Sequence, residues 1–229
     1  MTIQIRLATC RDGPAIARIC FQVFGERIAH DKPRVKNILS QEFTFVATSD
    51  GEVVGFVGNL LTLSARGDRR FELDLLAVAP AARGRGIGGR LVGHSLARAR
   101  QSDARVLRTL VAARNLKMQR ICAGYRFTRS DATYALHVSE PRASDVATGA
   151  AHCGHLVLVD TLIYSGIWLE GALSPTVIDS GLGRAARAGL TRVGAVVPLA
   201  DEETAALLRA RRFEAIGEYH WWTITLQNG

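Results

Sequence analysis

The chain has 229 residues, of which 48% are hydrophobic and 22% are charged, a composition typical of a soluble folded protein and not of a disordered one. Its net charge is +8 at pH 7, but the arginines are dispersed and the lysines are few, so the charge alone does not predict a nucleic-acid partner. No apolar run approaches the roughly 20 residues of a membrane span, and the N-terminus lacks the long apolar segment of a signal peptide, so we expect a cytoplasmic protein without membrane contact.

The first third of the chain predicts a strand, two helices and a hairpin. Residues 2–8 alternate as a strand does, and a helix starting at Asp12 and Pro14 places apolar side chains on one face at Ile16, Ile19, Cys20, Val23 and Phe24. A second helix is expected at about 33–40. Two strands then flank Asp50-Gly51, a dipeptide typical of tight hairpin turns.

The middle third predicts alternating strands and helices. Strand 69–78 leads into a glycine-rich turn, and helix 87–100 directs inward Ile87, Leu91, Val92, Ser95, Leu96 and Ala99. A strand at 104–112, a helix at 115–124 and a strand at 127–138 follow.

Residues 139–155 are small and polar and are expected to form a linker, after which the pattern restarts. A strand at 155–171, a helix from Ser174-Pro175, a strand at 192–198, a helix at 201–212 and a last strand are predicted. The segment from Arg105 to Phe127 has nearly the same spacing as that from Arg192 to Phe213, which suggests a partial internal repeat. We therefore expect domains at 1–140 and 141–229.

The turn "VAPAARGRGIGGRL" (78–91) between a strand and a helix is the arrangement that binds phosphate at a helix N-terminus. Gly84, Gly86 and Gly89 satisfy the dinucleotide fingerprint GxGxxG. However, some 70 residues precede it, and Asp103 lies before the following strand instead of ending it, which argues against a dinucleotide site. The sequence has no GKS or GKT, so a Walker phosphate loop is excluded.

The spacing Arg83-x-x-Gly86-x-Gly88 resembles the acetyl-CoA signature of the GNAT superfamily of N-acetyltransferases, and the order of elements over about 140 residues is similar to that fold. Asn115 and Phe127 fall where that family has its Asn and Phe. The resemblance implies an α+β fold with a mixed, mostly antiparallel sheet flanked by helices, followed by a smaller degenerate β-α-β-α-β module. It also implies an acetyl-CoA site formed by Ala77, Val78, Arg83, Gly84, Arg85, Gly86, Ile87, Gly88, Gly89 and Asn115.

Amine acetylation needs a base, because a lysine-like amine is mostly protonated at pH 7. Glu72 and Asp74 lie two apart on one predicted strand, where members of the family commonly place a carboxylate, and either could serve. The family's thiolate-protonating tyrosine is missing, since Cys122 stands at its position and Arg126 replaces the usual glycine before Phe127. Cys122 itself, Tyr125 three residues on, or water could supply this proton.

We therefore expect an enzyme, an acyl-CoA-dependent N-acyltransferase acting on a primary amine by direct attack, with acetyl-CoA as co-substrate and no metal. The acceptor is a small-molecule or peptide amine whose identity stays open, and a homodimer is compatible with the sequence. Segment 24–43, with Glu26, His30 and Asp31, falls where the family shapes its acceptor pocket. The alternatives are a non-catalytic CoA-binding or acyl-sensing module and a basic nucleic-acid-binding protein.

The cluster His152, Cys153 and His155 has no second pair of metal ligands.

Overall fold

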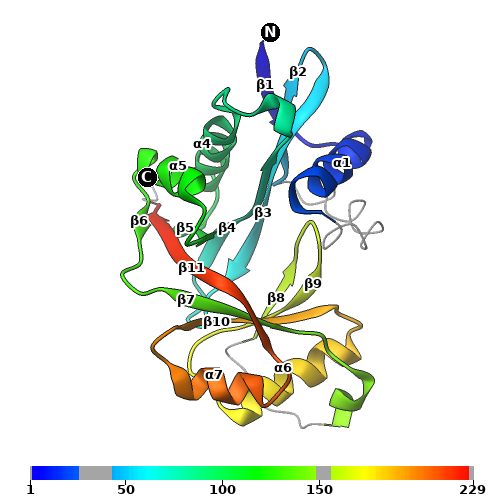
Figure 1. Cartoon of the computed structure of the whole chain (residues 1–229), viewed down its shortest axis with the longest axis vertical. Helices are drawn as coiled ribbons and strands as arrows, with labels where there is room; N and C mark the ends of the chain where they lie inside the picture. Colours follow the sequence, from blue (N-terminus) through cyan, green and yellow to red (C-terminus); the bar gives the residue numbers. More distant parts are fainter. Residues whose placement is uncertain (1, 26–42, 148–155, 227–229) are drawn as a thin grey trace.

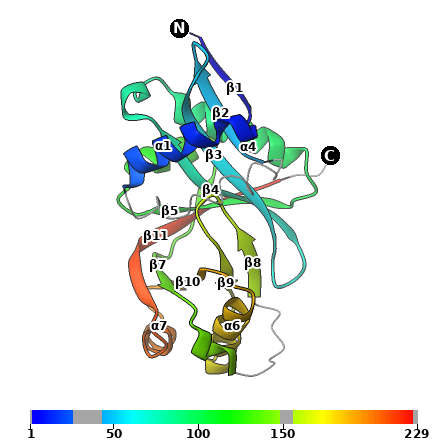
Figure 2. The same ribbon diagram turned by 90° about the vertical axis from the view of Figure 1, so that its right-hand side faces the viewer.

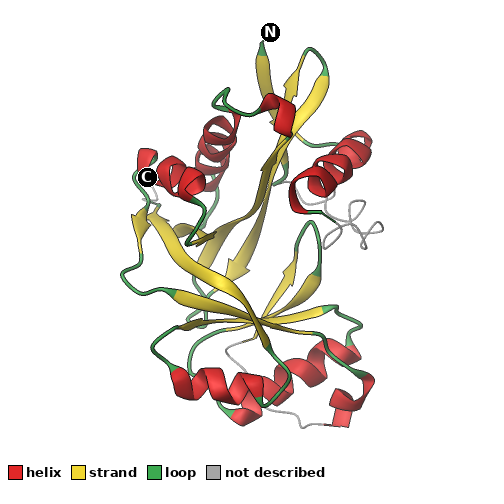
Figure 3. Ribbon diagram, viewed as in Figure 1, coloured by secondary structure: helices red, strands yellow, loops and turns green. Residues whose placement is uncertain are grey.

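The computed structural model describes residues 2–25, 43–147 and 156–226. Within this part, one mixed β-sheet runs the length of the molecule and helices pack on its faces (Figures 1 and 3). In chain order the elements are β1 (Ile3–Leu7), α1 (Gly13–Phe24), β2 (Phe45–Ser49), β3 (Glu52–Leu63), β4 (Arg69–Val78), α4 (Ile87–Arg100), β5 (Val106–Ala112), α5 (Leu116–Gly124), β6 (Thr128–Arg129), β7 (Tyr134–Ser139), β8 (Leu156–Asp160), β9 (Ser165–Leu169), α6 (Pro175–Arg187), β10 (Arg192–Pro198), α7 (Glu202–Arg209) and β11 (Glu214–Thr225), with short 3₁₀ turns at Cys10–Asp12, Pro80–Ala82 and Ala143–Ala147.

The strand order is β1-β2-β3-β4-β5-β11-β7-β10-β9-β8, and β6 also pairs with β11. Most neighbours are antiparallel, whereas β4–β5 and β9–β10 are parallel, which confirms the predicted α+β class. The last strand, β11, returns to lie between β5 and β7, and Trp222 on it is buried in the core under α4 and α5. Because the sheet is continuous, the boundary at 140/141 stays a prediction. We call residues 2–139 the N-terminal part and residues 156–226 the C-terminal part.

Both faces of the N-terminal part of the sheet are covered, by α4 and α5 on one side and α1 on the other (Figure 2). The helix at 87–100 forms as predicted, and its six predicted inward residues are all buried. The hairpin prediction is also confirmed: Asp50 and Gly51 both have positive φ, at 51° and 87°, as the mirror-image hairpin turn requires.

The predicted single strand at 155–171 is wrong, because it is an antiparallel hairpin, β8 and β9. Thr161 closes the turn: its amide donates to the carbonyl of Tyr164 at 2.8 Å, and its hydroxyl accepts from the amides of Ile163 and Tyr164. The middle of the turn, Leu162-Ile163, is apolar, and Leu162 is buried against Gly58 of β3. A tight turn whose side chains pack on another segment cannot be distinguished from strand by composition.

The predicted strand at 127–138 is likewise divided, into β6 and β7, with Ser130 turning the chain by donating to the carbonyl of Ala132 at 2.9 Å. Of the expected linker, Ser139 belongs to β7 and 143–147 form a 3₁₀ turn. The expected helix at 33–40, the residues Glu26, His30 and Asp31, and the cluster at 152–155 lie outside the described residues. Among the described residues, every helix is too short or too polar to cross a lipid bilayer.

Candidate active site

The candidate site lies where β4 and β5 separate. The parallel ladder between these strands ends with Glu72 opposite Arg108, while β4 continues to Val78 paired with β3. The edge of β4 beyond Glu72 is therefore open toward β5. The β3–β4 register shifts at the same point, where Leu73 faces Asn59 and Leu75 faces Gly58, so that Asp74 is an extra residue in a β-bulge.

A cavity of about 820 Å³ occupies this opening. Of the ten residues predicted to bind acetyl-CoA, nine line it: Ala77, Val78, Arg83, Gly84, Gly86, Ile87, Gly88, Gly89 and Asn115. Arg85 is not among the lining residues; its guanidinium instead lies 3.4 Å from the hydroxyl of Ser49. The glycine-rich turn, the start of α4 and the start of α5 thus border one cavity.

The glycines of the turn have different physical roles. Gly84 and Gly86 have φ of 79° and 71°, a region that favours glycine, and Gly86 is the N-cap of α4. Gly88 closely approaches α5, since an added Cβ would lie 3.3 Å from Ile121 Cδ1. At Gly89 an added Cβ would meet none of the described atoms within 4 Å. The amides at this helix start carry the partial positive charge that attracts phosphate oxygens.

Asp74 lines the cavity and is partly exposed to it. Burial, and to a smaller extent the neighbouring charge of Glu72, raises the pKa of its carboxyl to about 7. A carboxyl group that titrates near neutral pH is suited to accept and release a proton. The end of α1 contributes apolar neighbours, Val23 and Phe24, to the cavity.

Glu72 has a different environment, although it is two residues away. It is 2% exposed, and both carboxylate oxygens accept from Arg108 Nε at 2.8 Å. One oxygen also accepts from the hydroxyl of Thr62 at 2.6 Å. Glu72 does not line the cavity, so of the two predicted candidates for the base only Asp74 has access to it. Glu72 and Asp74 had been expected on the same face of the strand, because side chains two apart normally share a face. The bulge at Asp74 interrupts this alternation.

Cys122 and Tyr125, the predicted candidates for the acid, do not line the cavity. The Cys122 side chain is fully buried in the core, and burial raises the pKa of its thiol to about 12. The Tyr125 hydroxyl donates to the carbonyl of Gly89 at 2.7 Å and packs beside Gly93. Both side chains thus hold α5 against α4.

Sequence reasoning missed Tyr219, which lines the cavity from β11. It lies directly opposite Ala112 of β5, and burial raises the pKa of its hydroxyl. No sequence signal could have found it, because β11 inserts beside β5 from more than 100 residues away. Thr109 and Lys117 also line the cavity unpredicted. In the described ranges no three His, Cys, Asp or Glu side chains gather as a metal site would require.

The comparisons with known proteins agree with this geometry. Residues 15–124 match the family model described as "Acetyltransferase (GNAT) family". A proposed acetyltransferase from Pyrococcus horikoshii superimposes with a TM-score of 0.63 at 14% identity, over 98% of this chain and 90% of that one. A GCN5-related glucosamine N-acetyltransferase region of a fungal multi-domain β-N-acetylglucosaminidase gives a TM-score of 0.63 at 13% identity, over 97% of this chain and 38% of that one. Ard1 from Thermoplasma volcanium gives 0.50 at 23% identity, over 58% and 86%. No relative with a curated description matches the sequence.

Proposed function

Because residues 15–124 match the model of the acetyltransferase (GNAT) family, we propose that this chain transfers an acetyl group from acetyl-CoA to a primary amine by direct attack. The observation that carries the proposal is the cavity between β4 and β5, which has a helix N-terminus on its border and a carboxyl group with a pKa near 7 on its wall. The acceptor is a small-molecule or peptide amine, and we place the reaction in the cytoplasm.

The residues present fit acetyl-CoA. The turn from Arg83 to Gly89 supplies backbone amides for the pyrophosphate, and space is open at Gly84, Gly86 and Gly89, where an added Cβ would meet no described atom within 4 Å. Arg83 and Lys117 add positive charge at the border of the cavity. The unpaired edge of β4 from Leu73 to Val78 offers backbone donors and acceptors to the pantetheine amides and to the thioester oxygen.

Asp74 is the general base in this proposal. The neutral amine attacks the thioester carbonyl carbon, and Asp74 accepts the proton that nitrogen loses, directly or through one water. A carboxyl with a pKa of about 7 is a stronger base than an ordinary aspartate, and about half of it is ionised at neutral pH. Glu72 does not compete for this role, because its oxygens are engaged by Arg108 and Thr62.

Tyr219 is the proton donor to the leaving group. When the carbon–sulfur bond breaks, the CoA thiolate needs one proton. The thiol that it forms has a pKa of about 8.5, and a nearby phenol or water can supply the proton. Burial raises the pKa of Tyr219, so its hydroxyl is protonated at neutral pH. The phenol is a weaker acid than the CoA thiol, so water must return a proton to the tyrosinate after Tyr219 has donated to the thiolate. Cys122 and Tyr125 do not line the cavity, so neither side chain is placed to protonate the thiolate.

The first test is calorimetric titration with acetyl-CoA, with NADH as the control ligand. Gly89 offers a matched pair of variants, because the space beside it is open and it is the third residue of α4. Gly89→Asp places a negative charge against the pyrophosphate site, whereas Gly89→Asn has the same size without the charge. We expect Gly89→Asp to weaken acetyl-CoA binding at least about tenfold relative to Gly89→Asn, with both variants folded.

A thiol-release assay over a panel of amines then tests turnover. Acetyl-CoA binding without release of CoA over the whole panel would favour the non-catalytic acyl-sensing alternative. Binding of NADH in place of acetyl-CoA would restore the dinucleotide interpretation. Binding of neither ligand, together with salt-dependent affinity for DNA or RNA, would overturn the proposal in favour of a nucleic-acid-binding protein.

A further inference from the structure

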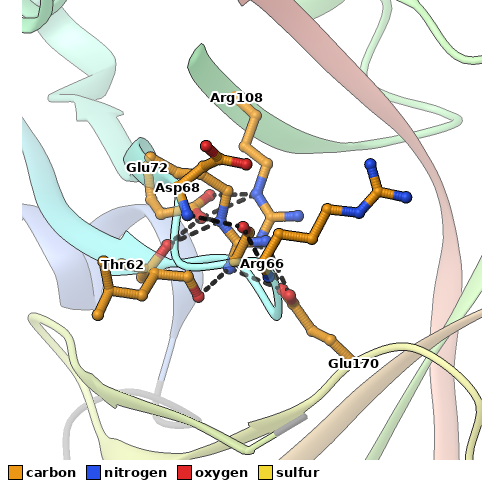
Figure 4. Close-up of polar contacts among 9 residues, drawn as sticks. Thr62, Arg66, Asp68, Glu72, Arg108 and Glu170 are labelled. Carbon is orange, nitrogen blue, oxygen red and sulfur yellow. Dashed lines mark hydrogen bonds and ion pairs between the residues drawn. The ribbon is translucent and has the colours of Figure 1, made fainter. Parts of the chain in front are cut away.

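Four charged side chains form a buried cluster where the C-terminal part meets β4 and β5 (Figure 4). Arg108 donates to Glu72 through Nε at 2.8 Å and to Glu170 through Nη2 at 2.6 Å. Arg70 donates to both oxygens of Glu170, at 2.7 and 3.1 Å, and its Nε lies 3.4 Å from Glu72. We call Arg70, Glu72, Arg108 and Glu170 the ion cluster.

The ion cluster is electrically balanced only because the C-terminal part contributes to it. It holds two guanidinium groups and two carboxylates, and the exposed fraction of their side chains is between 3% and 20%. Glu170 directly follows β9 and lies 100 residues from Arg70 along the chain. Burial acts to raise the pKa of Glu170, but the two arginines together outweigh it and lower this pKa, so Glu170 is ionised at neutral pH. Without this carboxylate, two arginines would face Glu72 alone, with one surplus positive charge.

The ion cluster lies next to the proposed base. Glu72 and Asp74 are two residues apart on β4, and the charge of one acts on the other. Tyr164 of the β8–β9 turn also interacts with Asp74, and its pKa is raised by burial and by the charge of Asp74. Trp168 Nε1 donates to the Tyr164 hydroxyl at 2.7 Å and fixes its position. From α1, the cavity receives the apolar side chains of Val23 and Phe24.

We propose that Glu170 is a positioning residue for catalysis: it holds Arg70 and Arg108 and cancels their surplus charge, so that Asp74 stays a strong base. In this way the C-terminal part sets the proton affinity of a group in the N-terminal part. As a general estimate, one unit of positive charge acting over about 10 Å at an effective dielectric constant of about 20 changes the proton affinity of a carboxylate roughly tenfold. The importance of this effect for the rate rests on the proposed function, but the effect on protonation does not.

The test is a direct titration of Asp74 in the full chain, by the ¹³C chemical shift of its carboxyl carbon, with the signal assigned from Asp74→Asn. Glu170→Gln leaves the cluster with a charge of about +1, and we expect the Asp74 midpoint to fall by about one pH unit. Arg70→Gln leaves it with a charge of about −1, and the midpoint should rise by a similar amount. The double variant Arg70→Gln/Glu170→Gln is neutral again, and its midpoint should return to within a few tenths of a unit of the wild type.

Asp179→Asn is the matched control, because it breaks an ion pair between α6 and Arg211 (2.6 Å) in the turn after α7, away from Asp74. It should lower stability without moving the Asp74 midpoint. Opposite shifts in the two single variants, with recovery in the double variant, support the proposal. Equal midpoints in all folded variants would overturn it, and shifts of the same sign in both single variants would assign the effect to distortion instead of charge.

The same variants separate this inference from the proposed function. If the midpoints shift as expected but no variant, including the wild type, releases CoA with any amine, the electrostatic inference stands and the acyl-transfer proposal fails. If CoA is released, the acid limb of kcat/KM against pH should move with the NMR midpoint in each variant. An acid limb that stays in place while the Asp74 midpoint moves would leave Glu170 without a role in the proton transfer.

Discussion

Arg126 and Arg212 have the same left-handed backbone conformation, with φ of 62° and 67°, at the ends of α5 and α7. Each precedes a buried phenylalanine whose amide donates to a carbonyl five residues back, Phe127 to Cys122 at 3.0 Å and Phe213 to Leu208 at 3.1 Å. This is the hydrogen bond that closes a helix in the Schellman motif, where glycine is the preferred residue. The two strand–helix units with similar spacing therefore also end alike.

This geometry predicts that Arg126→Gly stabilises the protein. Glycine removes the left-handed penalty of an L-residue but adds backbone entropy to the unfolded chain, so we expect a net gain of about 0.5–1 kcal/mol in the free energy of unfolding. Urea denaturation measures it, with Arg126→Ala as the control that keeps the Cβ. Arg212→Gly should gain less, because Arg212 donates to Asp145 at 2.6 Å. If Arg126→Gly is no more stable than Arg126→Ala, the helix end is not strained.

Asp74→Asn should abolish most of the acetyl transfer while acetyl-CoA still binds. Loss of a general base typically costs about 10²–10⁴ in rate, and asparagine cannot accept the proton. In the wild type, kcat/KM should rise with pH through a midpoint near 7, because the ionised form of Asp74 is the active one. For the residual activity of the variant, the plot of kcat/KM against pH should not show this rise near pH 7. Wild-type activity in Asp74→Asn would remove Asp74 from the mechanism.

The same residue predicts a stability change of a known sign. The pKa of Asp74 is raised in the folded protein from about 3.8 to about 7, so the fold favours the protonated form. The contribution of protonated Asp74 to the free energy of unfolding is complete below about pH 4 and is lost as the pH rises through 7. Asp74→Asn should therefore be more stable than the wild type at pH 8, by about 1–3 kcal/mol, and nearly equal at pH 4. Thermal melts at the two pH values measure the difference, and an equal gain at both would point to packing instead of charge.

Tyr219→Phe should lower kcat by about 10–100-fold with little change in acetyl-CoA affinity, since it removes one proton donor and keeps the ring. Cys122→Ala and Tyr125→Phe are the comparison, because these side chains pack in the helix interface and do not reach the cavity. Both should retain kcat within about threefold and lose about 1–3 kcal/mol of stability. A large loss of kcat in Cys122→Ala alone would restore the buried thiol as the acid.

Sequence reasoning succeeded where local pattern decides the structure. The bounds of α4 and β4 and the residues around the glycine turn follow from periodicity, glycine and a family signature, and these are short-range features. It could not choose between Glu72 and Asp74, because the difference arises from a bulge against β3 and from Arg108, whose position depends on the pairing of β4 with β5. Likewise Glu170 reaches Arg108 through a side-chain hydrogen bond across 62 residues, and Tyr219 reaches the site because β11 pairs with β5 from more than 100 residues away. A single sequence carries no signal for either contact.

The contact of Gly58 with Leu162 predicts how the C-terminal part docks on β3. An ideal Cβ at position 58 would lie 2.5 Å from Leu162 Cδ1, and Leu162 is only 4% exposed. Gly58→Ala should therefore cost about 1–3 kcal/mol through overpacking, and Leu162→Ala about 2–5 kcal/mol through the cavity that it leaves. In the double variant the new methyl group occupies part of that cavity, so the combined loss should be smaller than the sum by at least about 0.5 kcal/mol. Denaturation of the four proteins completes the cycle, and simple additivity would mean that the β8–β9 turn does not rest on the strand beside Asp74.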